Sequence, residues 1–229
     1  QWDTLKGILN VNGGTVNLNA NTDIRFSIGN NSGANEINLN SGAITSWSGN
    51  QTGTTTTGVL DLNRNSGGAN NTFNLNGGTL TINQVVTDND NGIAAFNFNG
   101  GTLKAAGNTV NFILLGGGSQ TANVLSGGAL IDTAGFNVSI PQPLLGGGSG
   151  GLTKIGAGTL TLSGGYSYSG PTAVRGGTLA LDAALASSSS SVLSLSNATL
   201  TISQNNGSSS LFAGGVSLTG SNVINFNFG

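Results

Sequence analysis

The segment FNLNGGTLTI, residues 73–82, decides the fold class of this chain. In each half of the segment, a large apolar residue alternates with asparagine or threonine. Successive side chains of a β-strand point to opposite faces, so this alternation predicts two strands that are buried on one face only. The Gly77-Gly78 pair between the halves supplies the positive-φ geometry that a sharp corner needs. The segment is therefore predicted to form a strand, a corner and a second strand.

The same phrase recurs along the chain, clearly at 9–18 and 96–105 and more loosely at 37–46, 124–131, 156–162, 173–181 and 195–202. Its second glycine, or the equivalent residue, falls at positions 14, 42, 78, 101, 128, 158, 177 and 198, so the copies are 19 to 36 residues apart. Variable spacing in this range is typical of a solenoid with loops of different lengths.

One coil cannot bury its apolar face alone, whereas coils stacked about 4.8 Å apart share a continuous core. We therefore predict an all-β fold, a parallel β-helix (β-solenoid) of about eight irregular coils, as a single domain over residues 1–229. A stack of hairpins, as in a sandwich or barrel, is the alternative, but hairpins need the phrase every 10–15 residues or so. The outward asparagines either form ladders between coils or face water, and both are expected.

The composition excludes several functions. Only 6% of the residues are charged, the net charge is −2, and six Lys and Arg residues are too few for a nucleic-acid surface. The absence of cysteine and histidine removes disulfides, thiolate metal sites and the commonest general base. No stretch approaches the ~20 apolar residues of a membrane span. Because the chain starts with Gln1 and ends inside an alternating segment, we expect it to be part of a longer chain.

Few residues could carry chemistry. Asp88 and Asp90, in the segment TDNDNG at 87–92, are a weak calcium candidate, because alternating Asp and Asn before a glycine resemble half of an ion-binding loop. No Glu closes that loop, so a polar corner is the favoured interpretation. Asp61 and Arg64 would support an enzyme only if they met in a groove. We predict no catalytic, cofactor-binding or metal site.

The aromatic residues allow two interpretations. Trp2, Trp47, Tyr166 and Tyr168 are candidates for stacking on sugars, as aromatic side chains near loops do in carbohydrate-binding proteins. Packing inside the fold is the favoured interpretation. Four phenylalanines fit such an internal stack, namely Phe73, Phe96, Phe98 and Phe112.

Residues 151–164 read GLTKIGAGTLTLSG, and an aromatic segment and a second GGTL phrase follow up to residue 181. This stretch closely resembles the autotransporter-associated β-strand repeat of bacterial passenger domains. The resemblance implies a right-handed β-helix, export across the inner membrane and display outside the cell, at the cell surface in association with the outer membrane or in the medium. The motif carries no catalytic residue, so the resemblance assigns none.

We thus predict a secreted or surface-displayed structural protein that is not an enzyme, either a rod or an extracellular filament of the matrix or biofilm type. An adhesin or glycan-binding passenger is the alternative, and a polysaccharide-degrading β-helix enzyme is less favoured. The apolar, uncharged segment at 223–228 predicts end-to-end self-association, because an unpaired strand edge accepts another strand. Surface glycans are the second candidate partner.

Overall fold

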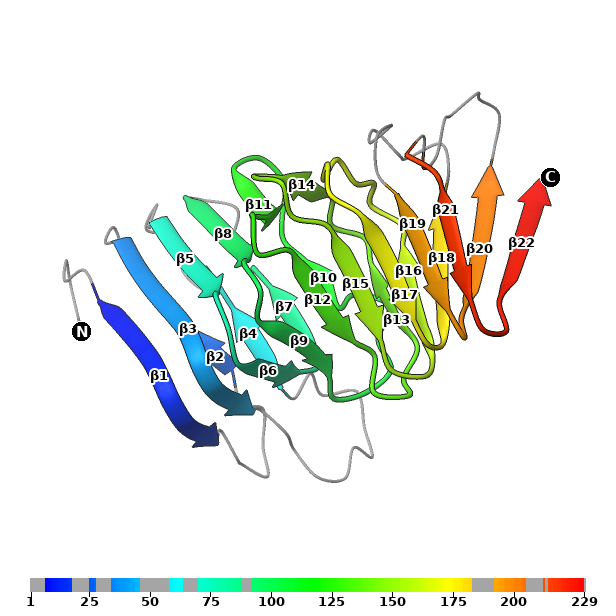
Figure 1. The fold of residues 1–229 in the computed structure, drawn as a ribbon. Helices are drawn as coiled ribbons and strands as arrows, with labels where there is room; N and C mark the ends of the chain where they lie inside the picture. Colours follow the sequence, from blue (N-terminus) through cyan, green and yellow to red (C-terminus); the bar gives the residue numbers. More distant parts are fainter. Residues whose placement is uncertain are drawn as a thin grey trace.

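The computed structural model describes residues 7–17, 25–27, 34–45, 58–63, 70–87, 92–182, 192–204, 212 and 214–228. These residues form β-strands joined by turns and loops, and the strand pairs are parallel. Figure 1 shows the strands stacked along one axis, from β1 (Ile8–Asn17) at one end to β22 (Val223–Phe228) at the other. Parallel pairing between successive turns excludes the hairpin stack and confirms the predicted parallel β-solenoid. Within the described ranges, no helix is long and apolar enough to cross a membrane.

The largest sheet has thirteen strands and bends around one corner of the solenoid. The long strand β3 (Ala34–Thr45) shows the bend, because its first half pairs with β5 and its second half with β6. Side 1, before the bend, contains the first halves of β1 and β3, then β5 (Asn70–Leu75), β8 (Ile93–Phe98), β11 (Gln120–Val124) and β14 (Leu144–Gly146). Side 2, after it, contains the second halves of β1 and β3, then β6 (Thr79–Ile82), β9 (Thr102–Ala105), β12 (Ala129–Asp132), β15 (Leu152–Ile155), β17 (Thr172–Arg175), β19 (Leu193–Ser196) and β21 (Val216–Thr219).

Two smaller sheets form side 3. The first contains β2 (Arg25–Ser27), β4 (Val59–Asp61), β7 (Gln84–Val86) and β10 (Ile113–Leu114). The second contains β13 (Val138–Ile140), β16 (Thr159–Leu162), β18 (Thr178–Asp182), β20 (Thr199–Gln204) and β22. A parallel bridge between Thr109 and Val138 joins the segment before β10 to the second of these sheets.

The core runs along the axis as columns of inward side chains in register. Phe73 pairs with Phe96, and their rings stack with centroids 5.4 Å apart. Phe98 meets Phe96 edge-on at 4.9 Å, and Phe112 is also fully buried. The predicted internal packing of these four phenylalanines is confirmed. Each buried ring contributes about 1.5–3 kcal/mol of hydrophobic stabilisation, and the stack adds van der Waals contact between turns.

Glycine is required at the corner between sides 1 and 2 because successive turns approach closely there. Gly78 has φ +65°, and a Cβ atom at this position would overlap the carbonyl oxygen of Gly42 on the preceding turn. Gly42 itself has φ +81° and stands in the same relation to Gly14. The second glycine of the repeated phrase therefore serves both the turn and the stacking.

The number of coils was predicted slightly too high. The solenoid makes about six turns instead of eight, and equivalent phrases do not occupy equivalent places in it. At 73–82 and 96–105 the two strands of the phrase lie on sides 1 and 2, whereas at 152–162 they lie on sides 2 and 3 as β15 and β16. The glycines of the later copies thus mark the corner between sides 2 and 3. Strands β17 to β22 alternate between these two sides.

Candidate functional site

Of the charged residues singled out by sequence as candidates for chemistry, Asp61 is the one that lies within the described residues. The calcium candidates Asp88 and Asp90 lie outside the described residues, as does Arg64. Asp61 is fully buried, and one of its carboxylate oxygens accepts a hydrogen bond from the backbone N–H of Asn63 at 3.1 Å. Among the described residues there is no group of three or more His, Cys, Asp or Glu side chains that could hold a metal ion.

Tyr166 and Tyr168 pack inside the solenoid. Only 4% and 1% of these residues are exposed, and their rings stack with centroids 5.7 Å apart. The hydroxyl groups of Tyr168 and Thr172 share a hydrogen bond of 2.9 Å. Burial raises the pKa of Tyr168 to about 12 and also raises that of Tyr166. The packing interpretation is confirmed for this pair, and the sugar-stacking one is wrong, because neither ring offers an open face. Trp2 and Trp47 lie outside the described residues.

Asparagine side chains form hydrogen-bonded ladders on the outer face of side 1. In the longer ladder, each Nδ2 donates to the Oδ1 of the asparagine on the preceding turn, over 2.8–2.9 Å, through Asn123, Asn97, Asn74, Asn38 and Asn10. A parallel ladder runs through Asn99, Asn76, Asn40 and Asn12, over 2.8–3.1 Å. These residues remain half-buried or exposed, so the outward asparagines both form ladders and face water, as predicted.

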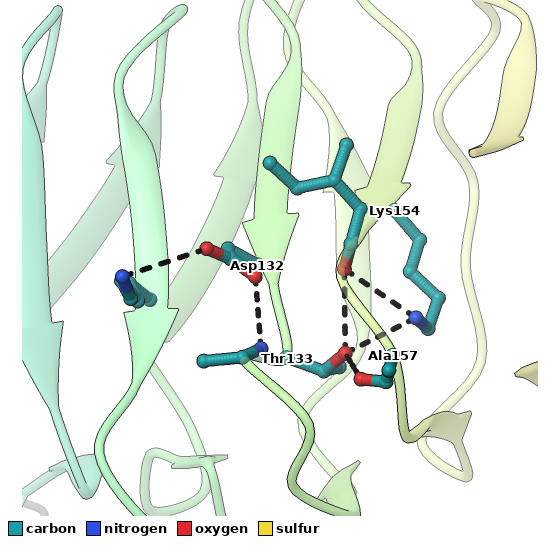
Figure 2. Close-up of polar contacts among 7 residues, drawn as sticks. Asp132, Thr133, Lys154 and Ala157 are labelled. Carbon is teal, nitrogen blue, oxygen red and sulfur yellow. Dashed lines mark hydrogen bonds and ion pairs between the residues drawn. The ribbon is translucent and has the colours of Figure 1, made fainter. Parts of the chain in front are cut away.

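Lys154 is the most unusual polar residue of the fold. It shares the inner face of β15 with Leu152 and is 0% exposed. Its ammonium donates to the carbonyl oxygens of Gly156 at 2.8 Å and Gly176 at 3.0 Å, and to the hydroxyl oxygen of Thr133 at 3.1 Å. These acceptors belong to three consecutive turns, so one side chain ties the three turns together. Figure 2 shows the bond from Lys154 to Thr133 on the preceding turn.

Thr133 continues this polar cluster. It is fully buried, and its hydroxyl donates to the carbonyl oxygen of Ala157 on the next turn. The neighbouring Asp132 accepts a hydrogen bond from the backbone N–H of Ala134 at 2.8 Å and lies 3.9 Å from the ammonium of Lys104 (Figure 2). Burial lowers the pKa of Lys154 to about 8, and the negative charge of Asp132 opposes this shift.

The cluster is suited to holding turns together and not to catalysis. Each of the three ammonium hydrogens of Lys154 has an oxygen acceptor, and the side chain has no contact with solvent. A buried amine whose donors are all used cannot take a proton from a substrate or attack it. Sequence reasoning missed this residue, although one signal was present: in the segment LTKI, Lys154 has the same inward parity as Leu152.

The comparisons with known proteins address this region. The model of the passenger-associated-transport-repeat family matches residues 152–181, a stretch that includes Lys154 and both buried tyrosines. The match confirms the predicted resemblance, and together with the β-solenoid it fits an autotransporter passenger domain with β-strand repeats. Comparisons with curated proteins and with solved structures found no significant match.

Proposed function

We propose that this chain is a structural β-solenoid displayed outside the cell, serving as a rod or as a filament of an extracellular matrix. The observation that carries the proposal is the use of polar groups between turns. The asparagine ladders and the bonds from Lys154 to Thr133 and Gly176 join neighbouring turns. Polar groups that bond to neighbouring turns stabilise a long stack, and few such groups are then available to bind or activate a substrate. The proposed role is therefore not enzymatic.

The proposed location rests on the family match. A passenger-associated transport repeat and a β-solenoid fit proteins that are secreted or held at the surface in general. The adhesin alternative has less support, because the tyrosines that could have formed a sugar platform are buried. For this reason we place the structural role first.

The finer proposal is that parallel strand pairing continues from one chain to another. Val216 and Leu218, on β21, are 54% and 55% exposed, and Val223 on β22 is 52% exposed. Apolar side chains on a strand edge favour pairing with a further strand, whereas charged ones oppose it. A second copy of this chain, or a neighbouring solenoid segment, would cover them in the proposed filament.

Electron microscopy and light scattering of the concentrated full chain test the filament. Fibres with a regular axial repeat are expected, and replacing both Val216 and Leu218 by lysine should abolish them. Val110→Lys is the matched control, because Val110 is 76% exposed but lies in the middle of the chain. Circular dichroism would verify that each variant retains its β-structure. A wild-type protein that stays monomeric at high concentration would refute the filament and leave the rod.

A further inference from the structure

A column of inward side chains on side 1 contains polar residues where the other inward columns are mostly apolar. Asn35 on β3 pairs with Asn71 on β5, which pairs with Ala94 on β8, which in turn pairs with Gln120 on β11. Asn71 and Ala94 are 0% exposed and Gln120 is 5% exposed. Buried amides need hydrogen-bond partners, because burial removes the water that they would otherwise bind.

The first part of this column is a continuous chain of hydrogen bonds. The backbone N–H of Gly7 donates to Asn35 Oδ1 at 3.2 Å, and Asn35 Nδ2 donates to Asn71 Oδ1 at 2.9 Å. Because Asn71 Oδ1 faces Asn35, Asn71 Nδ2 faces the following turn, where Ala94 occupies the column. Asn71 Nδ2 is buried and has no hydrogen-bond partner in the structure.

The amide of Gln120 approaches the same turn from the other side. Its Nε2 donates to the carbonyl oxygen of Gly92 at 3.3 Å, which draws the amide back toward the turn that contains Ala94. Its Oε1 is buried and has no hydrogen-bond partner either. A buried donor and a buried acceptor therefore flank the one rung of the column that has a methyl group instead of an amide.

The separation of the two amides calls for a bridging group. Asn71 and Gln120 lie on strands two turns apart, about 9.6 Å at the usual strand separation, which a direct amide hydrogen bond cannot span. The bridging group must accept from an N–H and donate to a carbonyl oxygen. A cation would be repelled by the positively polarised Nδ2 hydrogens, and an anion would be repelled by the lone pairs of Oε1. Water satisfies both atoms, and the difference in size between alanine and asparagine is about that of one water molecule.

We propose that a buried water molecule is bound at the Ala94 rung, where it accepts a hydrogen bond from Asn71 Nδ2 and donates one to Gln120 Oε1. The water completes an internal chain of hydrogen bonds from Gly7 to Gly92 that involves five successive turns, those of β1, β3, β5, β8 and β11. This inference does not depend on the proposed function, because it concerns only the packing between β5, β8 and β11.

A high-resolution crystal structure of the full chain tests the proposal directly. The expected result is a density peak of water size within hydrogen-bond distance of Asn71 Nδ2 and Gln120 Oε1. Absence of density there, or a peak whose neighbours and scattering identify an ion, would overturn it.

A pair of matched variants tests the same site in solution. Ala94→Asn supplies an amide in place of the water, so its melting temperature should equal or exceed that of the wild type. Ala122→Asn is the control, because Ala122 is equally buried on side 1 but pairs with Phe96 and Leu144, which offer no polar side chain. That control should melt at a clearly lower temperature. If Ala94→Asn fails to fold, or loses as much as Ala122→Asn, the proposed site is wrong.

Discussion

The buried ammonium of Lys154 gives the sharpest prediction, which concerns stability against pH. The pKa of Lys154 is lowered to about 8 in the fold, from 10.5 in the unfolded chain. Between these two values the unfolded chain binds more protons than the folded one, so the free energy of unfolding rises with pH in this window. The difference of about 2.5 pKa units corresponds to a rise of roughly 3 kcal/mol in the free energy of unfolding across this window, since each unit is about 1.4 kcal/mol.

Lys154→Met removes the charge and keeps most of the side-chain volume. We expect two results in urea unfolding followed by circular dichroism from pH 7 to pH 10. At pH 7 the variant is less stable by roughly 1–3 kcal/mol, because the carbonyl oxygens of Gly156 and Gly176 lose a donor. Above pH 8 the wild type gains stability, whereas the variant does not.

Lys104→Met is the control for this experiment, because the Lys104 side chain is 43% exposed and lies on the outer face of β9. It should keep the rise of stability above pH 8. If the wild type and Lys154→Met show parallel pH profiles, the ammonium is not buried as described, and the role of Lys154 in joining three turns is wrong. A wild-type profile that falls between pH 8 and 10 would refute the reasoning equally.

Three further substitutions test the other inter-turn contacts. Gly158→Ala should lower the free energy of unfolding more than Gly135→Ala does. Both positions have positive φ (+85° and +92°), but of the two only Gly158 would place the added Cβ against backbone of the preceding turn. Equal losses of stability in urea unfolding would argue against this close approach. Tyr168→Phe should lower the free energy of unfolding by about 0.5–1.5 kcal/mol, because the hydrogen bond to Thr172 is lost. The wild type should also lose stability above pH 10, because the pKa of Tyr168 is raised to about 12 in the fold, and the variant should lose less. Asn97→Asp removes a ladder donor and should destabilise the fold by about 1–3 kcal/mol at pH 7. Part of this stability should return below about pH 4, because a protonated carboxyl group can donate a hydrogen bond. If the stability of the variant does not change with pH across that range, the ladder contributes nothing.

The local structure of each repeat could be predicted from sequence, whereas its place in the solenoid could not. Alternation in FNLNGGTLTI is enough to predict two strands and a corner, and β5 and β6 follow it. The phrase does not state which side of the solenoid it occupies, because that depends on the strands of the preceding turn. GAGTLTL at 156–162 reads like the earlier copies, yet its strand β16 stacks on β13 of side 3.

The Lys154 cluster could be predicted only in part. The inward position of Lys154 follows from strand alternation, but its acceptors do not. Thr133 is 21 residues before it and Gly176 is 22 after it, and these separations equal one turn only in this part of the chain. Elsewhere one turn takes 23 or 36 residues, as between the ladder asparagines Asn97, Asn74 and Asn38. Contacts between turns therefore depend on loop lengths that a periodic motif does not encode.

The stacking geometry explains why so few residues are charged. In a parallel solenoid, equivalent outward side chains of successive turns lie about 4.8 Å apart. Like charges in such a column would repel, whereas an asparagine donates to one neighbour and accepts from the other. Uncharged amides are thus the polar side chains that the columns on side 1 can repeat at every turn. Lys154 fits the same rule, because its column neighbours are uncharged, Ile131 on β12 and Val174 on β17, and carbonyl oxygens surround its ammonium. Low charge and high asparagine content are, on this view, requirements of the stack itself and not signs of disorder.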